Sequence, residues 1–393
     1  MTDTPTLDER RNRLVDQITS GRTLPRTVER AMRTVPRDRF LPGLDPSRAY
    51  TDEAVTIKDN PDGPQPLSLA SVPSIVAMML GQLDAQPGDR ILEVGAGTGY
   101  NAALLAEIVG PDGAVTTVDI DTDVALHART MLDRAGYDRV TVMQRDGLLG
   151  APGNAPYDRL IATVGLWDIP RAWWGQLADG GRLVLPLRWR GQTRSVSLIR
   201  RGDTLVSEGM ELCGFVPIIG QDGERTVELF DGRIRLHHDV DQEVRGDRLR
   251  DVFSGPVVET WAEARVGGQE PFDGVWLRAT MKDDTVCRLE ATSEALASGV
   301  RRPAIPVRTP AVVVDDSLAY MILLREDMDP ARPWRLGAAG YGPAGAALAR
   351  RMVAHIDAWG ADRTAVPAMT IYATAAPAGG HPISKKESVI VLA

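Results

Sequence analysis

A glycine-rich turn between a strand pattern and a helix pattern is the strongest constraint on the fold of this chain. The apolar run 90–95 precedes the turn, and the amphipathic pattern 100–110 follows it. The turn itself reads Glu93-Val94-Gly95-Ala96-Gly97-Thr98-Gly99. Glycine accepts the positive φ of a tight turn and lets a ligand approach the backbone closely. The sequence therefore predicts a ligand at the N-terminus of the helix that the turn opens.

Strand and helix patterns alternate after this turn, and such alternation predicts a parallel α/β sheet. Before it we expect a helical region over 8–36 and an apolar helix over 74–83. The further strands expected are 114–120, 139–144, 157–164 and 181–187, with helices over 124–136 and near 170–178. A closing pair of strands is expected over 195–201 and 210–218.

The pattern changes after Gly220, where strand-like stretches are no longer interleaved with regular helices. These stretches are TVELFDGRIRL, GVWLRATM and AVVVDDSLAYMILLR, and one amphipathic helix follows over 342–359. A length of 393 residues also suggests two domains. We therefore expect an α/β domain over 1–220 and an α+β extension over 221–393.

Composition and charge exclude several classes of protein. The chain is 43% hydrophobic, and its net charge of −8 disfavours broad nucleic-acid binding. No apolar run has the roughly 20 residues that span a bilayer, and the polar N-terminus lacks a signal core. The two cysteines cannot form a metal cluster or a disulfide framework, and His237-His238 has no further ligands nearby. We expect a cytoplasmic protein with no metal, no membrane partner and no nucleic-acid partner.

The acids that follow the next two strands narrow the class of ligand. Tyr100 stands where a dinucleotide fingerprint has its third Gly or Ala, and no phosphate-cradling GK[ST] string is present. Asp119 ends the next strand, where a carboxylate usually binds ribose hydroxyls. Asp146-Gly147 follows the third strand. This order resembles class I S-adenosylmethionine-dependent methyltransferases, which implies a Rossmann-like doubly wound sheet and S-adenosylmethionine as cofactor.

Seven flanking blocks, in order, resemble the protein-L-isoaspartate O-methyltransferase family. The resemblance covers about residues 8–220. The blocks are VPRDRFLP (35–42), AYTDEAVTI (49–57), SVPSIVAMM (71–79), ILEVGAGTGYNAALLA (91–106), the 146–163 segment, QLADGGRLVLP (176–186) and GFVPIIG (214–220).

The resemblance implies a role for each matching residue. The loop would hold the methionine end of the cofactor, Asp119 the ribose and Asp146 the adenine amine. The implied cofactor-binding set is Glu93, Gly95, Ala96, Gly97, Thr98, Gly99, Asp119, Ile120, Asp146 and Gly147. Ser71 would be the catalytic residue beside the reacting carboxylate. The implied substrate-binding residues are Ser68, Thr163 and Val164.

Ser71 also has a second interpretation, as the N-cap of the helix over 74–83, and the two roles are compatible. The chain departs from the family nearby, because Leu69 replaces a polar residue and Val72 replaces a Gln. These changes leave the preference for an isoaspartyl main chain open. Trp173-Trp174 follow the fourth strand, where they could pack in the core or contact a peptide.

The extension over 221–393 resembles the C-terminal half of actinobacterial "FxLD system" methyltransferases, found with lanthipeptide and graspetide gene clusters. The blocks are PFDGVWLRAT (271–280), SLAYMILLR (317–325) and GAAGYGPAGAALARRMVAHIDAW (337–359). This implies a modified precursor peptide as partner, methylated on a normal Asp. The ester would then close to an aspartimide, which hydrolysis converts to isoaspartate. The extension would recognise the crosslinked peptide.

Three other functions remain as alternatives. The first is repair of isoaspartyl residues in damaged proteins. The second is methylation of RNA or a small molecule, which the negative charge and the lack of an N/D-P-P-[YFW] motif disfavour. The third is a cofactor-binding or scaffold protein without activity. The target Asp, the peptide class, the final product and the oligomeric state stay open.

Overall fold

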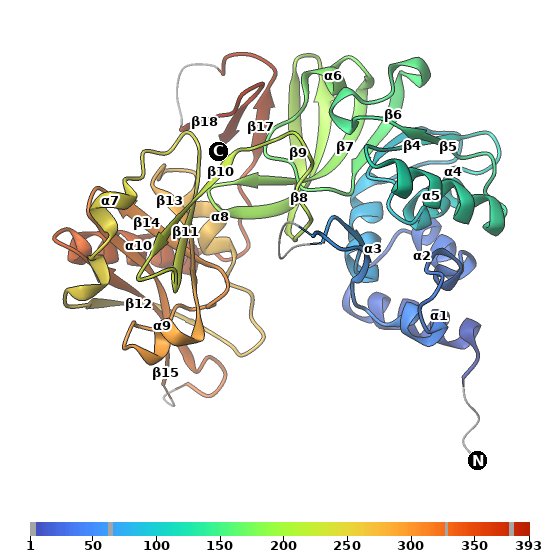
Figure 1. Ribbon diagram of the computed structural model, residues 1–393. Helices are drawn as coiled ribbons and strands as arrows, with labels where there is room; N and C mark the ends of the chain where they lie inside the picture. The colour runs from blue at the N-terminus through green and yellow to red at the C-terminus, as the bar shows by residue number, and fades with distance from the viewer. Residues whose placement is uncertain (1–4, 62–65, 327–328, 377–380) are drawn as a thin grey trace. The chain divides into compact units, whose positions relative to one another are not determined.

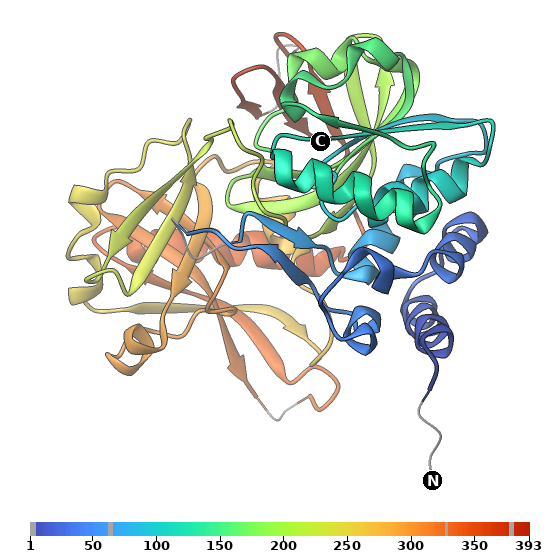
Figure 2. The same cartoon turned by 45° about the vertical axis from the view of Figure 1, so that its right-hand side comes forward.

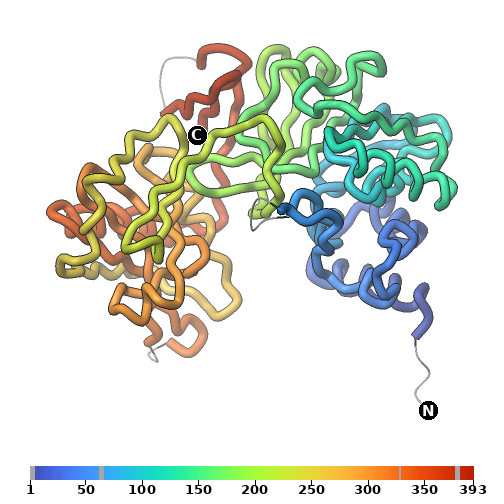
Figure 3. The backbone as a smooth tube through the Cα atoms, in the orientation of Figure 1, coloured from blue at the N-terminus to red at the C-terminus, as the bar shows by residue number. Residues whose placement is uncertain are grey.

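The computed structural model describes residues 5–61, 66–326, 329–376 and 381–393. The chain divides into two compact units, and each has a hydrophobic core of its own (Figure 1). The first unit is Met1–Leu187 with Arg194–Gln221, and the second is Arg188–Thr193 with Asp222–Ala393. The backbone passes from one unit to the other at 187/188, 193/194 and 221/222, and its path can be followed in Figure 3.

The region expected to be helical over 8–36 forms two α-helices with an interruption between them. They are α1 (Leu7–Gly21) and α2 (Arg26–Thr34). The interruption has a local cause, because Pro25 precedes α2 and proline cannot donate a backbone hydrogen bond within a helix. Two short 3-10 helices follow, η1 (Arg37–Phe40) and η2 (Pro46–Tyr50).

The central sheet of the first unit is mostly parallel and has the strand order β9-β8-β7-β6-β3-β4-β5. Its strands are β3 (Arg90–Val94), β4 (Ala114–Asp119), β5 (Thr141–Gln144), β6 (Tyr157–Ala162), β7 (Leu177–Trp189), β8 (Gln192–Arg201) and β9 (Thr204–Leu212). The chain runs outward from β3 to β4 and β5, then returns to β6 on the other side of β3. This reversal creates a switch point, where parallel α/β sheets bind their ligands.

Helices cover this sheet because its strands are apolar on both faces. Ile91, Val115 and Ile161 belong to the core shared with α1–α4, whereas Leu160 and Leu183 face the tryptophans of α6 on the opposite side. Figure 2 shows α5 lying along the sheet. The helices are α3 (Pro73–Leu83), α4 (Tyr100–Val109), α5 (Thr122–Ala135), α6 (Arg171–Trp174), η3 (Gly147–Leu149) and η4 (Pro152–Asn154); a hairpin of β1 (Val55–Lys58) and β2 (Ser68–Ala70) precedes α3.

The closing strand pair differs from the expected one, because the partner of β8 is Thr204–Leu212 and not 210–218. Arg201 pairs directly with Thr204, so Gly202-Asp203 forms a two-residue hairpin loop with Gly202 at φ +59°. Residues beyond Leu212 are therefore free to run elsewhere. Gly165 N–H donates to the Val216 carbonyl (2.7 Å), and Ile218 N–H donates back to the Gly165 carbonyl (2.8 Å).

The second unit is built on a seven-stranded sheet with the order β10-β11-β13-β14-β15-β16-β12. Each pair of neighbours in it is antiparallel. Its strands are β10 (Glu224–Leu229), β11 (Ile234–Asp239), β12 (Val258–Val266), β13 (Val286–Ala291), β14 (Thr309–Val314), β15 (Ser317–Arg325) and β16 (Trp334–Tyr341). A ladder of three short strands follows, formed by β17 (Met369–Tyr372), β18 (Pro382–Ser384) and β19 (Val389–Leu392).

Helix α10 (Gly345–Ala361) packs on one face of this sheet. The stretch GVWLRATM, expected as a strand, is instead helix α8 (Gly274–Ala279). Its apolar residues are buried beside α10, so tertiary packing overrides the β preference of Val275 and Trp276. The remaining helices are α7 (Gly246–Leu249), η5 (Val252–Ser254) and α9 (Ser293–Ala297). The expected class, a Rossmann-like doubly wound sheet with an α+β extension, is confirmed.

The tip of the β7–β8 hairpin, residues 188–193, is a structural part of the second unit. Trp189 is fully buried there, and its indole N–H donates to the Thr280 hydroxyl (3.2 Å). Trp276 donates in turn to the Arg190 carbonyl (3.0 Å). The sequences of β7 and β8 do not indicate that their tip belongs to the second unit, because each strand is continuous across the boundary between the units.

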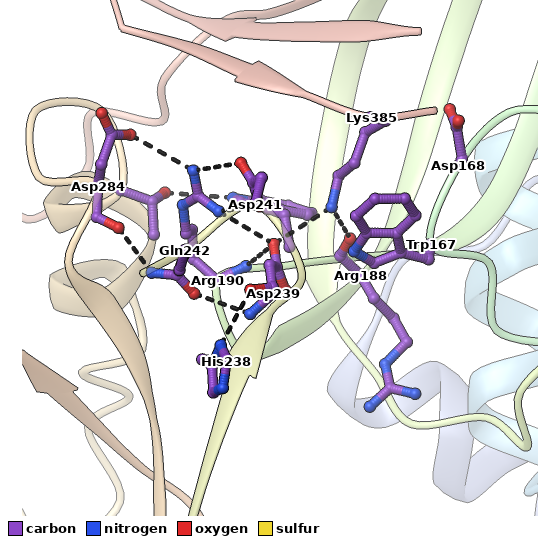
Figure 4. Close-up of polar contacts among 12 residues, drawn as sticks. Trp167, Asp168, Arg188, Arg190, His238, Asp239, Asp241, Gln242, Asp284 and Lys385 are labelled. Carbon is purple, nitrogen blue, oxygen red and sulfur yellow. Dashed lines mark hydrogen bonds and ion pairs between the residues drawn. The ribbon is translucent and has the colours of Figure 1, made fainter. Parts of the chain in front are cut away.

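A buried charge cluster fixes the same hairpin tip (Figure 4). Asp239, 2% exposed, accepts from the Arg190 backbone N–H (2.9 Å) and from Lys385 Nζ (3.2 Å). The Arg190 guanidinium also forms a two-point pair with Asp241, at 2.7 and 2.9 Å. Buried charges are tolerated only when they are paired in this way, so the cluster specifies one position for the tip.

Within the described part of the chain, no helix combines the length and the apolarity that a membrane span requires.

We predict that Asp239→Asn destabilises the second unit, because the substitution leaves Lys385 Nζ and the Arg190 guanidinium buried without that carboxylate. Its unfolding free energy should fall by about 3 kcal/mol, the scale for breaking a buried pair. Chemical denaturation measures the change. Asp231→Asn is the control, since the Asp231 side chain is 87% exposed and forms only a surface pair with Arg233. Equal stability of the two variants would contradict the prediction.

Candidate cofactor and acceptor site

The crevice of the first unit opens at the carboxyl ends of β3, β4 and β6, beside the switch point. Strand ends, the β1–β2 hairpin and the segment after β9 all contribute to it. The residues that line it are Leu67, Ser68, Leu69, Ser71, Val94, Gly95, Gly97, Val118, Asp119, Ile120, Asp121, Val124, Asp146, Gly147, Thr163, Val164, Val216, Pro217, Ile218 and Ile219.

The glycine loop forms the floor of the crevice, and its conformation requires glycine. Gly95 has φ +101° and Gly97 has φ +51°. A Cβ on Gly95 would lie 2.6 Å from Thr163 Oγ1, which itself donates to the Gly95 carbonyl (2.8 Å). A Cβ on Gly97 would project into open space beside the loop. The backbone thus forms a cradle that side chains at these two positions would fill or distort.

Asp119 stands at the end of β4 and connects the loop to the start of α5. Its Oδ2 accepts from Gly97 N–H (3.2 Å), and its Oδ1 accepts from Asp121 N–H (3.1 Å). Burial raises the pKa of the Asp119 carboxyl, while these backbone N–H groups oppose the shift. The acid is therefore held in one orientation at the rim of the cradle, as a ligand for two hydroxyls requires.

The β1–β2 hairpin is tied to this rim by one lysine. Lys58 Nζ lies 2.5 Å from Asp121 Oδ2 and 3.3 Å from Asp123 Oδ2. Asp121 also caps the N-terminus of α5, since its Oδ1 accepts from the N–H groups of Asp123 and Val124. The pair with Lys58 lowers the pKa of Asp121. The hairpin that carries Ser68 and Leu69 is thereby held over the crevice.

Glu93 lies at the end of β3, behind the loop rather than in the crevice wall. It is fully buried, and its Oε1 accepts from the Asn101 amide (2.7 Å). Burial raises the pKa of Glu93 to about 7. Its link to Asn101 connects β3 to the first turn of α4, so Glu93 supports the loop from below.

Asp146 and Gly147 follow β5 and line the crevice. Asp146 Oδ1 accepts from Leu148 N–H (2.9 Å) and fixes η3. A Cβ on Gly147 would lie 2.4 Å from Val94, so only glycine fits there. Trp173 is 1% exposed and its indole donates to the Gly147 carbonyl (2.9 Å). Of the two interpretations of Trp173, core packing is the one found, with a hydrogen bond to the loop in addition.

Ser71 lies between β2 and α3, where it lines the crevice with Ser68, Thr163 and Val164. Its alternative role as a helix cap is wrong. Helix α3 begins at Pro73 with Val72 as N-cap and no side-chain cap from its own segment. The Ser74 N–H instead donates to Asp52 Oδ1 (2.8 Å), a residue from the loop before β1.

The structure brings most of the expected site residues into one crevice. Those that line it are Ser68, Ser71, Gly95, Gly97, Asp119, Ile120, Asp146, Gly147, Thr163 and Val164. Glu93, Ala96, Thr98 and Gly99 stand outside its wall and shape the turn. The glycine cradle and the two acids, Asp119 and Asp146, fit S-adenosylmethionine, which presents an amino-acid end, a ribose and an adenine.

Residues 216–219 form part of the crevice wall that sequence reasoning missed. Residues 216–218 were expected in a sheet strand, yet Val216, Pro217 and Ile218 line the site together with Ile219. Ile219 is 58% exposed, a large value for an isoleucine, and Leu67 across the hairpin is 43% exposed. The Pro217 that interrupts the apolar run is the one local signal against a strand.

Comparison with known proteins identifies the family to which the chain is similar. A family model described as protein-L-isoaspartate(D-aspartate) O-methyltransferase matches residues 9–223, more than half of the chain. The chain belongs to this family. The protein-L-isoaspartate O-methyltransferase of Methanopyrus kandleri is 39% identical over 216 residues, covering 54% of this chain and 92% of the relative. That of Hyperthermus butylicus is 39% identical over 230 residues, covering 56% and 92%.

Family membership makes the chain an S-adenosylmethionine-dependent carboxyl O-methyltransferase, of a family that acts on proteins or peptides. A solved structure of a protein-L-isoaspartate O-methyltransferase covers 92% of this chain and 96% of its own, with a TM-score of 0.50 and 20% identity. At that identity the likeness concerns the fold alone. The structural likeness covers most of the second unit as well as the first. A C-terminal extension of similar size therefore also occurs in a protein named protein-L-isoaspartate O-methyltransferase.

We predict that Asp119→Ala weakens S-adenosylmethionine binding about 10- to 100-fold, the scale of charged hydrogen bonds lost with their acceptor. Isothermal titration calorimetry measures the dissociation constant. Asp112→Ala, in an exposed turn before β4, is the matched control and should bind like the wild type. Wild-type affinity in Asp119→Ala would remove Asp119 from the binding site.

We predict a pH-dependent stability difference between the wild type and Glu93→Gln. The pKa of Glu93 is about 7 in the folded state against 4.5 when unperturbed, so the folded state retains the proton longer. Between these pH values Glu93 makes the wild type progressively less stable, by up to ~3 kcal/mol, and the loss is complete above the folded pKa. Glutamine lacks this titration.

Urea denaturation of both proteins across this range measures the effect. The stability of Glu93→Gln relative to the wild type should rise with pH and then level off. A constant difference at every pH would refute the shifted titration of Glu93, and Asp112→Asn serves as the control for added neutral amide.

Proposed function

We propose that the chain methylates a normal Asp side chain of a ribosomally made, modified peptide, a lanthipeptide or graspetide, in the cytoplasm. The ester would lead to an aspartimide and, after hydrolysis, to isoaspartate. The supporting observation is a crevice in the first unit that most of the expected site residues line, together with a second compact unit that contributes none of them. Such an added unit suits recognition of a peptide that carries crosslinks.

Methyl transfer to a carboxylate requires the chain mainly to align the carboxylate with the methyl group of the cofactor. Bound S-adenosylmethionine supplies an electrophilic methyl group, and an Asp carboxylate with a pKa near 4 is already ionised at neutral pH. The oxygen–methyl bond forms as the sulfur–methyl bond breaks, and no proton is transferred. Ser71 and Thr163 would orient the acceptor, while Leu67 and Ile219 would exclude water. The absence of a general base in this scheme follows from the ionised acceptor.

The ester makes ring closure possible without a further enzyme. The backbone amide nitrogen of the next residue attacks the ester carbonyl, loses its proton and expels methanol, which leaves a succinimide. Leu69 supports a changed acceptor, because an apolar side chain replaces a polar family residue beside Ser71 in the crevice. A leucine side chain has no polar atom, so it cannot form a hydrogen bond with the rerouted main chain of an isoaspartyl peptide.

Repair of isoaspartyl residues in damaged proteins is the second candidate. Its support is the 39% identity to relatives that carry the repair enzyme's name. A solved structure with the repair enzyme's name also matches 92% of this chain, so the presence of a C-terminal extension does not by itself separate the two functions. The substrate must therefore be tested directly.

We predict that the full-length chain methylates a crosslinked Asp-containing precursor faster than the same peptide without crosslinks, and faster than a generic isoaspartyl peptide. Tandem mass spectrometry should show a product heavier by one methylene, then a product lighter than the starting peptide by one water. The matched control is Asp119→Ala, which should form both products more slowly, because it binds S-adenosylmethionine more weakly.

Preference for the isoaspartyl peptide would instead assign the repair function. A truncation after Gly220 is not a suitable test, because it would remove the residues that bury Trp189 and Arg190. Loss of activity would then report misfolding rather than recognition.

A further inference from the structure

We propose that Arg37 is a positioning residue that fixes the acceptor segment around Ser71. The inference rests on the proposed role of the Ser71 crevice in methyl transfer, whichever acceptor is used. Arg37 stands outside the crevice wall, and no sequence motif of the cofactor site includes it. It acts on Ser71 through the main chain, so it touches neither cofactor nor acceptor.

The Arg37 side chain is 1% exposed and contacts three separate segments. Its Nη1 donates to the Ala49 carbonyl (2.8 Å) at the end of η2. Its Nη2 donates to the Ser71 carbonyl (3.0 Å) and, more weakly, to the Glu53 carbonyl (3.4 Å). One guanidinium therefore links η1 and η2 to the segment that carries the predicted catalytic serine.

A second contact holds the other side of the same segment. Asp52 accepts from Ser74 N–H (2.8 Å), and Asp52 adjoins Glu53 in the chain. Pro73 lies between the two fixed points and has a restricted φ. The Ser71 carbonyl is thus anchored to Arg37 of η1, and the Ser74 N–H is anchored to Asp52 in the loop before β1. These two contacts leave little freedom to the main chain between them.

The choice of arginine has a physical reason. A buried guanidinium loses its hydration, and burial lowers the pKa of Arg37. That cost is offset only when several donors find acceptors, and arginine presents five donors in a fixed planar fork. Lysine has the charge but concentrates its donors on one atom, so it cannot span carbonyls of three segments in this geometry.

The same residue also reaches the cofactor helix. The Arg37 guanidinium lies 6.0 Å from the centre of the Tyr100 ring, and Tyr100 is the first residue of α4. Phe40 of η1 packs on the same ring, with centroids 5.7 Å apart. Arg37 therefore lies between the acceptor segment and the start of the cofactor helix, where a shift of either would misalign the two reactants.

The test compares Arg37→Lys and Arg37→Met with the wild-type full-length chain. The matched control is Arg39→Lys and Arg39→Met, since Arg39 is exposed in the same 3-10 helix. S-adenosylmethionine and an isoaspartyl peptide are the probes, with the crosslinked Asp peptide used instead where the wild type accepts only that. If the wild type does not methylate the isoaspartyl peptide, the role of Arg37 can therefore still be tested with the crosslinked Asp peptide.

We expect the Arg37 variants to bind S-adenosylmethionine within about threefold of the wild type while kcat falls about 10- to 100-fold, the scale for misplaced reacting groups. The Arg39 variants should keep wild-type kcat. A double-mutant cycle gives the deciding readout. In a Ser71→Ala background, Arg37→Lys should cost much less in kcat than it does alone, because the hydroxyl that it positions is already absent.

Additive effects of Arg37→Lys and Ser71→Ala would overturn the proposal, since Arg37 would then act independently of the serine. Equal loss of cofactor binding and kcat would also overturn it, as would loss of cooperative unfolding in both Arg37 variants. Those outcomes assign Arg37 a general structural role in the N-terminal region.

Discussion

The close approach of the glycine loop to the end of β6 is the constraint on which the site depends. Gly95 can adopt φ +101° and leave room for Thr163 only because it has no side chain. The Thr163 hydroxyl then joins β6 to β3 across the switch point. The glycine cradle and the end of β6 thereby meet in one crevice, and the remaining helices and strands keep these two strand ends in register.

Supports outside the crevice complete this arrangement. Trp173 holds Gly147 from the opposite face of the sheet, and Lys58 ties the β1–β2 hairpin to the rim. Arg37 and Asp52 anchor the segment that bears Ser71. Each support comes from a different part of the chain, which is typical of reactions that need alignment more than acid–base catalysis.

Local patterns predicted the parts of the fold in which one physical signal dominates. The glycine turn and Asp119 occupy the positions that strand and helix periodicity implied for them. Prediction was wrong where a local signal was weak or overridden. The partner strand of β8 was expected over 210–218, but the Gly202-Asp203 hairpin loop starts it at Thr204 instead. The stretch over 274–281 was expected as a strand, but it forms α8 because its apolar residues pack beside α10.

The sequence by itself determined the α/β architecture, through periodicity and through glycine at positions of restricted φ. Its resemblance to a known family gave the cofactor class and half of the residues that line the crevice. Only the tertiary structure assigned the Ser71 carbonyl to Arg37 and the hairpin tip 188–193 to the second unit. Both depend on hydrogen bonds and ion pairs between residues distant in sequence. Such pairings have no local signature, since a buried arginine and an exposed one have the same letter.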